Sequence, residues 1–234
     1  MEQDKQQDKE QMETQKPERK PDETGGIHVQ GHIKIFDPES GEVFINKRNA
    51  IHYENMSVSL AQCIANKVSA TNGTPQHFVY EMHFGNGGTA VDPTGVISYL
   101  PTNTNAQNSN LYNPTYFKIV DDTSIKNTDP ARNKITVLHT PGNIYTDILV
   151  TCLLDYGEPA DQAAFDNSQS LNGDYVFDEL GLKARSLDGS EGLTTTGLLL
   201  THVVFHPVQK SLNRLIQIDY TVRIQTLTNL SSLG

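Results

Sequence analysis

The sequence predicts a mainly β protein: a single antiparallel β-sandwich or barrel-like domain with one short helix and a disordered or extended N-terminal arm. Segments in which apolar and polar residues alternate far outnumber those with helical spacing. Turn-forming Gly, Pro, Asn and Asp residues separate these segments. Strands and helices do not alternate along the chain, as a doubly wound fold requires. These three observations favour an all-antiparallel architecture.

The first segment, residues 1–25, differs from the rest of the chain. It has no aromatic residue and carries eight acidic against five basic side chains. Such a segment cannot bury enough apolar surface to offset the entropy lost on ordering. We therefore expect a polar, charged arm that is either solvated or extended against a neighbouring subunit. The β-rich structural domain then comprises residues 26–234.

A β-hairpin is predicted at the start of this domain. Apolar and polar residues alternate from Ile27 to Ile35, which is typical of a strand with one buried face. The turn-forming run from Asp37 to Glu42 follows, and Val43 begins a returning strand.

One helix is predicted over residues 56–68, with Asn55 or Ser57 as its N-cap. The segment 69–75 ends it, and a second short helix is expected at residues 159–167. The apolar residues at helical spacing are Leu60, Ala61, Ile64 and Val68.

The remaining pattern predicts strands and long connections. The clearest strand alternates apolar and polar residues from Ile216 to Gln225. Two polar loops, residues 101–115 and 186–197, are expected to be flexible and to stay outside the packed core. The predicted strands are 77–84, 95–100, 115–120, 134–139, 144–155, 198–206 and 214–226.

The glycine-rich segment from His83 to Thr89 invites a comparison with phosphate-binding loops. A Walker loop needs a lysine directly after its last glycine, whereas Gly88 is followed by Thr89. A dinucleotide loop must open a helix, which Pro93 and Gly95 prevent. The segment therefore predicts a strand-ending turn, whose glycines take positive φ or let two backbones approach closely.

The histidines do not predict a metal site. His202 and His206 are four residues apart, but the segment is β-branched and should be a strand. On a strand the two side chains stand about 13 Å apart, too far to share one ion. The same argument excludes a pair at His28 and His32. The other two histidines considered, His83 and His139, are isolated in the sequence.

The two cysteines, Cys63 and Cys152, lie in apolar contexts. We expect two buried free thiols that act as small apolar side chains. A disulfide and a nucleophilic role are the weaker alternatives.

No catalytic residue is predicted. A pair of carboxylates could serve a glycosidase, but nothing in the sequence brings the candidates together, and no nucleophile elbow is present. We therefore expect neither an enzyme nor a bound cofactor. The four carboxylates considered are Asp155, Glu158, Asp178 and Glu179.

The formal net charge of −10 argues against general binding of nucleic acid. No apolar run approaches the ~20 residues that span a bilayer, and the polar N-terminus does not resemble a signal peptide. The sequence thus predicts a soluble protein made in the cytoplasm.

Several phrases together resemble virion structural proteins of tailed bacteriophages, especially contractile-tailed ones. They are "HIKIFDPESGEVFINKRNAIHYENMS", "HFGNGGT", "FDELGL" and "LTHVVFHPVQKSLNRLIQIDYTVRI". The resemblance covers residues 30–226 and brings no motif with an assigned role, so no functional residue carries over.

The resemblance implies a non-enzymatic component of the virion, in the neck, tail or baseplate region. Its partners would be other virion proteins, and it would form a homo-oligomer or ring. The turn at Asp37–Glu42 and the loop 101–115 would be contact elements. The alternatives are a capsid decoration protein and a host-surface glycan-binding module. The aromatic residues around the loop that could stack on a sugar are Tyr99, Tyr112, Tyr116 and Phe117.

Overall fold

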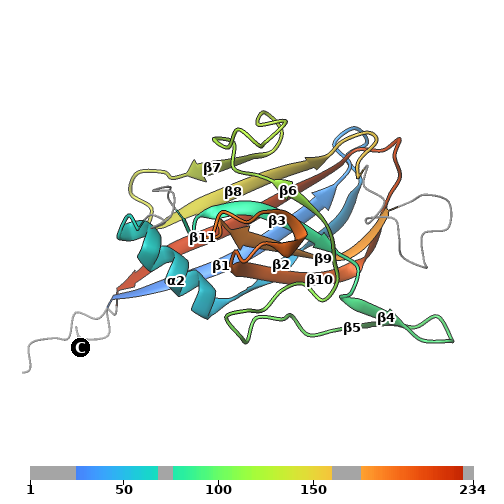
Figure 1. Ribbon diagram of the computed structural model, residues 1–234, viewed down its shortest axis with the longest axis horizontal. Coiled ribbons are helices and arrows are strands. Elements are labelled where there is room, and N and C mark those ends of the chain that lie inside the picture. Colours follow the sequence, from blue (N-terminus) through green and yellow to red (C-terminus); the bar gives the residue numbers. More distant parts are fainter. Residues whose placement is uncertain (1–24, 68–75, 160–174, 229–234) are drawn as a thin grey trace, which may run out of the picture. The chain divides into compact units, whose positions relative to one another are not determined.

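The computed structural model describes residues 25–67, 76–159 and 175–228. It confirms the predicted fold class: the protein is mainly β, with one α-helix and a large antiparallel sheet that curls into a half-barrel (Figure 1). The strands are β1 (Gly25–Phe36), β2 (Val43–Ile51), β3 (Val79–Gly85), β4 (Thr89–Val91), β5 (Ile97–Tyr99), β6 (Pro114–Ile119), β7 (Lys134–Leu138), β8 (Tyr145–Leu154), β9 (Tyr175–Ala184), β10 (Leu199–Lys210) and β11 (Ile216–Thr228).

The nine-stranded sheet has the order β6-β3-β9-β10-β2-β1-β11-β8-β7, and β4 and β5 form a separate two-stranded sheet. Strand β2 joins the two halves of the large sheet. Most of β2 pairs with β1, while its last residues, Ala50 and Ile51, pair with His202 and Thr201 of β10. The curl therefore brings one half of the sheet over the other.

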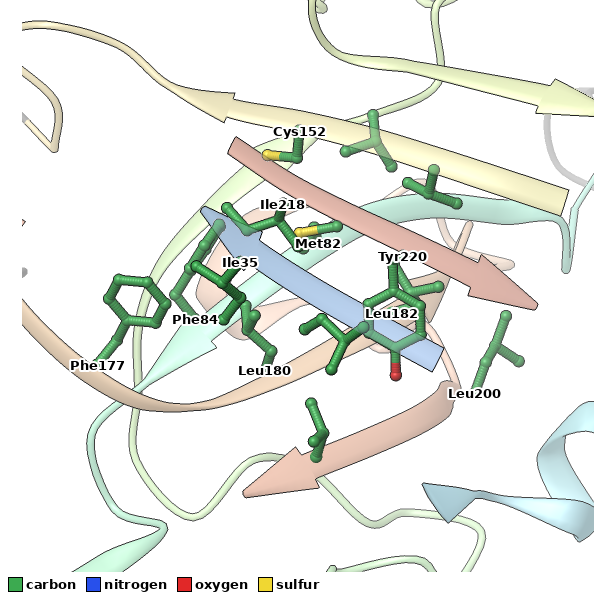
Figure 2. Close-up of a cluster of buried hydrophobic side chains, with 14 of the residues drawn as sticks. Ile35, Met82, Phe84, Cys152, Phe177, Leu180, Leu182, Leu200, Ile218 and Tyr220 are labelled. Carbon is green, nitrogen blue, oxygen red and sulfur yellow. The ribbon is translucent and has the colours of Figure 1, made fainter. Parts of the chain in front are cut away.

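The core fills the space between these halves. Of the side chains labelled in Figure 2, Ile35, Ile218 and Cys152 come from β1, β11 and β8, whereas Met82 and Leu180 come from β3 and β9 in the other half of the sheet. All five side chains are fully buried. Alternate residues of each strand point into this space, which explains why the alternating pattern predicts most strands.

The predicted hairpin is confirmed. Strands β1 and β2 pair antiparallel, and the Asp37 carboxylate accepts hydrogen bonds from the N–H groups of Glu39 and Ser40. Gly41 takes a positive φ of 76° in this turn, a conformation that glycine adopts without strain.

The single α-helix, α2 (Tyr53–Ile64), begins and ends earlier than predicted. Neither predicted residue caps it, because the His52 ring accepts the Asn55 N–H at 3.2 Å. The predicted inward face is also wrong at Ile64, which is exposed. The Asn55 side chain instead donates to the Leu199 carbonyl at 2.9 Å and fixes which face points inward. Of the predicted apolar stripe, Val68 lies outside the described residues.

Two strands were not predicted. The short β4 follows the glycine-rich segment, and β9 lies in the middle of one half of the sheet. Strand β9 is almost entirely buried, so it lacks the alternation of apolar and polar residues that marks a strand with one solvent-exposed face. The predicted helix at 159–167 falls, except for Pro159, outside the described residues, as does the arm 1–25 except for Gly25.

The chain divides into two compact units, and residues Val29–Gln225 form the larger one. The described part of the smaller unit comprises residues 25–28 and 226–228. Ile27, the first apolar residue of the predicted strand, belongs to it and is exposed. In the described part of the chain, no helix is both long and apolar enough to cross a membrane.

Candidate functional site: a buried polar cluster beneath two loops

Strands β3, β9 and β10 carry charged side chains on the face opposite the core. Leu180 and Leu182 of β9 point into the core, so their neighbours Glu179 and Lys183 point to the other side. These outward side chains are nevertheless buried. We call this group, together with Asp178, the polar cluster: Glu81, His83, Asp178, Glu179, Lys183 and His202.

Loops cover the polar cluster. The loops predicted at 101–115 and 186–197 were both expected to be flexible; β6 begins at Pro114, so the first is the 101–113 loop. Leu111, Ser186 and Thr195 of these loops are nevertheless buried. A Cβ atom at Gly181 would lie 2.8 Å from the Leu111 side chain, which shows how closely the first loop packs on β9. The expectation that these loops lack packing is therefore wrong.

Glu179 holds the 101–113 loop. One carboxylate oxygen accepts the N–H of Asn113 at 2.8 Å and that of Gly87 at 3.2 Å. The other accepts the N–H of Tyr112 at 3.0 Å and the His202 ring Nε2–H at 3.0 Å. Both oxygens of this buried carboxylate thus have two donors each, which offsets the cost of burying its charge.

His202 links the same carboxylate to the start of the loop. Its Nδ1 accepts the Asn103 N–H at 2.8 Å, so the ring proton lies on Nε2 and is donated to Glu179. Burial raises the pKa of Glu179, but the hydrogen bonds from His202, Asn113 and Tyr112 outweigh it, and the pKa lies below its ordinary value.

Asp178 holds the glycine-rich segment. Its two oxygens accept the N–H groups of Gly88 and Thr89, each at 2.9 Å. A Cβ atom at Gly88 would lie 2.9 Å from a methyl group of Val204, so only glycine fits this approach. Burial raises the pKa of Asp178. The expected close approach of two backbones is confirmed in the same segment, because a Cβ atom at Gly87 would lie 2.8 Å from the Asn113 backbone nitrogen.

Glu81 holds the 186–197 loop. One of its oxygens accepts the Gly192 N–H at 2.9 Å, and the other binds the His83 ring at 2.7 Å. Both side chains are buried, and burial lowers the pKa of His83. This pair repeats, on β3, the carboxylate–histidine arrangement of Glu179 and His202.

The four carboxylates considered for catalysis fall into two separate pairs. Asp178 and Glu179 bind the loops above, whereas Asp155 and Glu158 lie beside two lysines. Glu158 forms an ion pair with Lys118 at 2.6 Å. Each pair has its own partners, and the structure does not bring the two together.

The histidines do not share a ligand. His202 is buried against Glu179, whereas His206 is exposed and lies near the Tyr99 hydroxyl. Within the described residues, no group of three His, Cys, Asp or Glu side chains could hold a metal ion.

The cysteines are both free. Cys152 is fully buried as expected, and burial raises its pKa to about 12. The expectation is wrong for Cys63, which is exposed, because α2 turns Asn55, Met56 and Ser59 inward.

Among the aromatic residues considered for sugar stacking, only Tyr99 and Tyr112 are exposed. Tyr116 packs against the core, and Phe117 lies 6.0 Å from the His83 ring. The stacking face expected from four rings is therefore reduced to two.

The polar cluster has the residue types of a catalytic site, but its central carboxylate–histidine pair is fully buried. Glu179 and His202 are buried and bonded to each other and to backbone, so neither presents a proton or a lone pair to solvent. Sequence reasoning missed the lysine and the Glu81–His83 pair. Comparisons with protein-family models, curated proteins and solved structures found no match for the chain.

Proposed function

We propose that the protein is a non-enzymatic structural component of a tailed bacteriophage particle, in the neck, tail or baseplate region, and that it acts through subunit–subunit contacts. The phrases that resemble virion proteins motivate the assignment. Two of them, "HFGNGGT" and "FDELGL", meet at the bonds between Asp178 and the glycine-rich segment. Their role there is to hold the loops in place, which suits an assembly subunit.

The observation that carries the proposal is an exposed apolar patch on the β4–β5 hairpin. Val91, Val96 and Tyr99 are 52%, 61% and 54% exposed, and the adjoining Leu100 is 39% exposed. Apolar side chains gathered on one projecting element are typical of protein contact surfaces. We call these four residues the hairpin patch.

A rigid base supports the hairpin patch. The Leu100 N–H donates to the Gly88 carbonyl at 2.9 Å, and Gly88 is itself held by Asp178. A surface fixed before binding loses little entropy on association. The polar cluster would thus contribute to assembly by positioning the contact element.

Light scattering on the full chain over a range of concentrations tests the proposal. We expect a homo-oligomer or ring, and we expect cryo-electron microscopy of intact particles to find the chain in the neck, tail or baseplate. A position on the head would favour the capsid decoration alternative. A chain that stays monomeric and is absent from particles would contradict the proposal.

The exposed Tyr99 and Tyr112 support a second candidate, a host-surface glycan-binding module. Tyr112 donates its hydroxyl to the Pro101 carbonyl at 2.7 Å, which fixes the ring while its face stays partly exposed. A glycan array that gives a saturable signal, lost in Tyr112→Ala, would favour this candidate over a purely structural role.

A further inference from the structure

A cleft of about 330 Å³, lined by both polar and apolar atoms, opens between the two loops that cover the polar cluster. Residues 107–110 form one wall and residues 195–198 form the other. Lys183 of β9 also lines the cleft. The two loops are held by different carboxylates, Glu179 and Glu81, so the cleft between them is a fixed feature of the fold.

Lys183 is a buried cation with few partners. It is 2% exposed, and within the described residues the only hydrogen bond of its ammonium group is to the Thr195 carbonyl at 3.4 Å. An ammonium group has three donors, so two are left over. Buried charges are normally paired or fully hydrogen-bonded.

The nearest carboxylate does not supply the missing acceptors. Glu81 contributes a favourable charge interaction with Lys183, but its two oxygens bind the Gly192 N–H and the His83 ring rather than the ammonium group. No ion pair joins Glu81 and Lys183 in the described structure. An acceptor that enters the cleft would therefore find an ammonium group ready to donate.

The rest of the lining consists mainly of neutral hydrogen-bonding groups. In the part of the chain that the structure describes, the side-chain amides of Gln107 and Asn108 make no hydrogen bond, and the Asn110 amide nitrogen donates none. Thr196 lines the opposite wall. Amides of this kind donate to and accept from hydroxyl groups.

We propose that this cleft binds a small carboxylic acid that also carries hydroxyl groups, the chemistry of a sugar acid. The ligand carboxylate accepts from the Lys183 ammonium group, and its hydroxyl groups bind the amides of residues 107–110. The volume is at the lower end of that of small-molecule sites and suits one sugar ring. This activity is separate from assembly, because it does not involve the hairpin patch.

Isothermal titration of the full-length protein with D-glucuronate tests the proposal, with D-glucose and acetate as comparison ligands. We expect saturable binding of glucuronate and at least about tenfold weaker binding of the other two, because glucose lacks the carboxylate and acetate lacks the hydroxyl groups. Lys183→Met keeps the length of the side chain and removes the charge. It should weaken glucuronate binding about ten- to a hundredfold.

Two further variants keep the test decisive. Lys134→Met removes the same charge at an exposed position in β7 and should bind glucuronate as the wild type does. Asn108→Ala changes an exposed amide, so it should fold normally and still weaken binding severalfold. The proposal is overturned if glucuronate does not bind, if glucose or acetate binds equally well, or if folded Lys183→Met and Asn108→Ala both keep wild-type affinity.

Discussion

Glu179 joins four segments of the chain through one side chain. It belongs to β9 and accepts hydrogen bonds from the glycine-rich segment, from the 101–113 loop and from His202 of β10. None of its partners is close in sequence, so this one side chain helps to fix the position of two loops on the sheet.

Replacing Glu179 by glutamine should destabilise the protein by about 2–4 kcal/mol. The substitution replaces one carboxylate oxygen by an NH₂ group, which is itself a donor. In one orientation this group faces the N–H groups of Gly87 and Asn113. In the other it faces the Tyr112 N–H and the His202 Nε2–H. His202 cannot switch tautomer without losing the bond from Asn103. The shift in the urea unfolding midpoint measures the loss. Glu42→Gln, at an exposed ion pair with Arg214, is the matched control and should change stability by less than about 1 kcal/mol.

The same carboxylate predicts a pH dependence. The pKa of Glu179 in the folded protein lies below the ordinary value of 4.5, so its contribution to stability is complete above pH 4.5 and is lost as the pH falls through the folded pKa. The difference in unfolding free energy between wild type and Glu179→Gln should be constant above that value and should narrow below it. Urea titrations of both proteins at several pH values measure it. A gap that persists unchanged down to acid unfolding would show that ionisation of Glu179 is irrelevant.

At the scale of the element, β9 is the strand whose outer face is covered by the 101–113 and 186–197 loops. A Cβ atom at Gly181 would lie 2.7 Å from a Leu199 methyl group and 2.9 Å from the Thr201 carbonyl. Gly181→Ala should therefore cost about 1–3 kcal/mol, because backbone cannot move aside as a side chain can. It should also speed amide hydrogen exchange at Tyr112, since the Leu111 side chain must shift.

Gly26→Ala, in β1, is the control for the substitution of Gly181. The nearest atom to its new Cβ is 3.9 Å away, so the stability should change little. If Gly181→Ala leaves both the unfolding midpoint and the exchange rate at Tyr112 unchanged, β9 is not packed beneath the loop as described.

The contrast between β11 and β9 shows what the sequence can predict. The apolar residues of β11 face the core and the polar ones face away, so alternation reveals the strand. In β9 the outward residues Glu179 and Lys183 are covered by loops that lie far away in the sequence. Their burial depends on tertiary contacts that no local pattern records.

The same limit applies to the polar cluster. The sequence drew attention to Asp178 and Glu179 as carboxylates and to the glycine-rich segment as a turn, but it did not predict that they bind each other. The bond between Gly88 N–H and Asp178 spans 90 positions. The sequence predicted that a helix is present but not which of its faces points inward, because the Asn55–Leu199 contact sets that orientation.

At the scale of the whole molecule, the described chain combines a buried core with an exposed apolar patch on the β4–β5 hairpin. Glu179 and His202 are buried and bonded to each other, whereas the hairpin patch is exposed. If the protein assembles as proposed, the assembly free energy should come mainly from this patch. Buried apolar side chains at the centre of an interface usually carry most of its affinity.

The variant Val91→Ser/Val96→Ser tests this directly. Both side chains are exposed, so the unfolding free energy of the single subunit should change by less than about 1 kcal/mol. The subunit affinity should fall at least about tenfold, because the two side chains no longer bury apolar surface. Sedimentation velocity over a concentration series measures the change.

Ile125→Ser, which alters a fully exposed residue outside the hairpin, should assemble as the wild type does. Unchanged assembly of the folded double variant would place the subunit contact on another surface, whereas loss of assembly in Ile125→Ser as well would show that the effect is not specific to the hairpin patch.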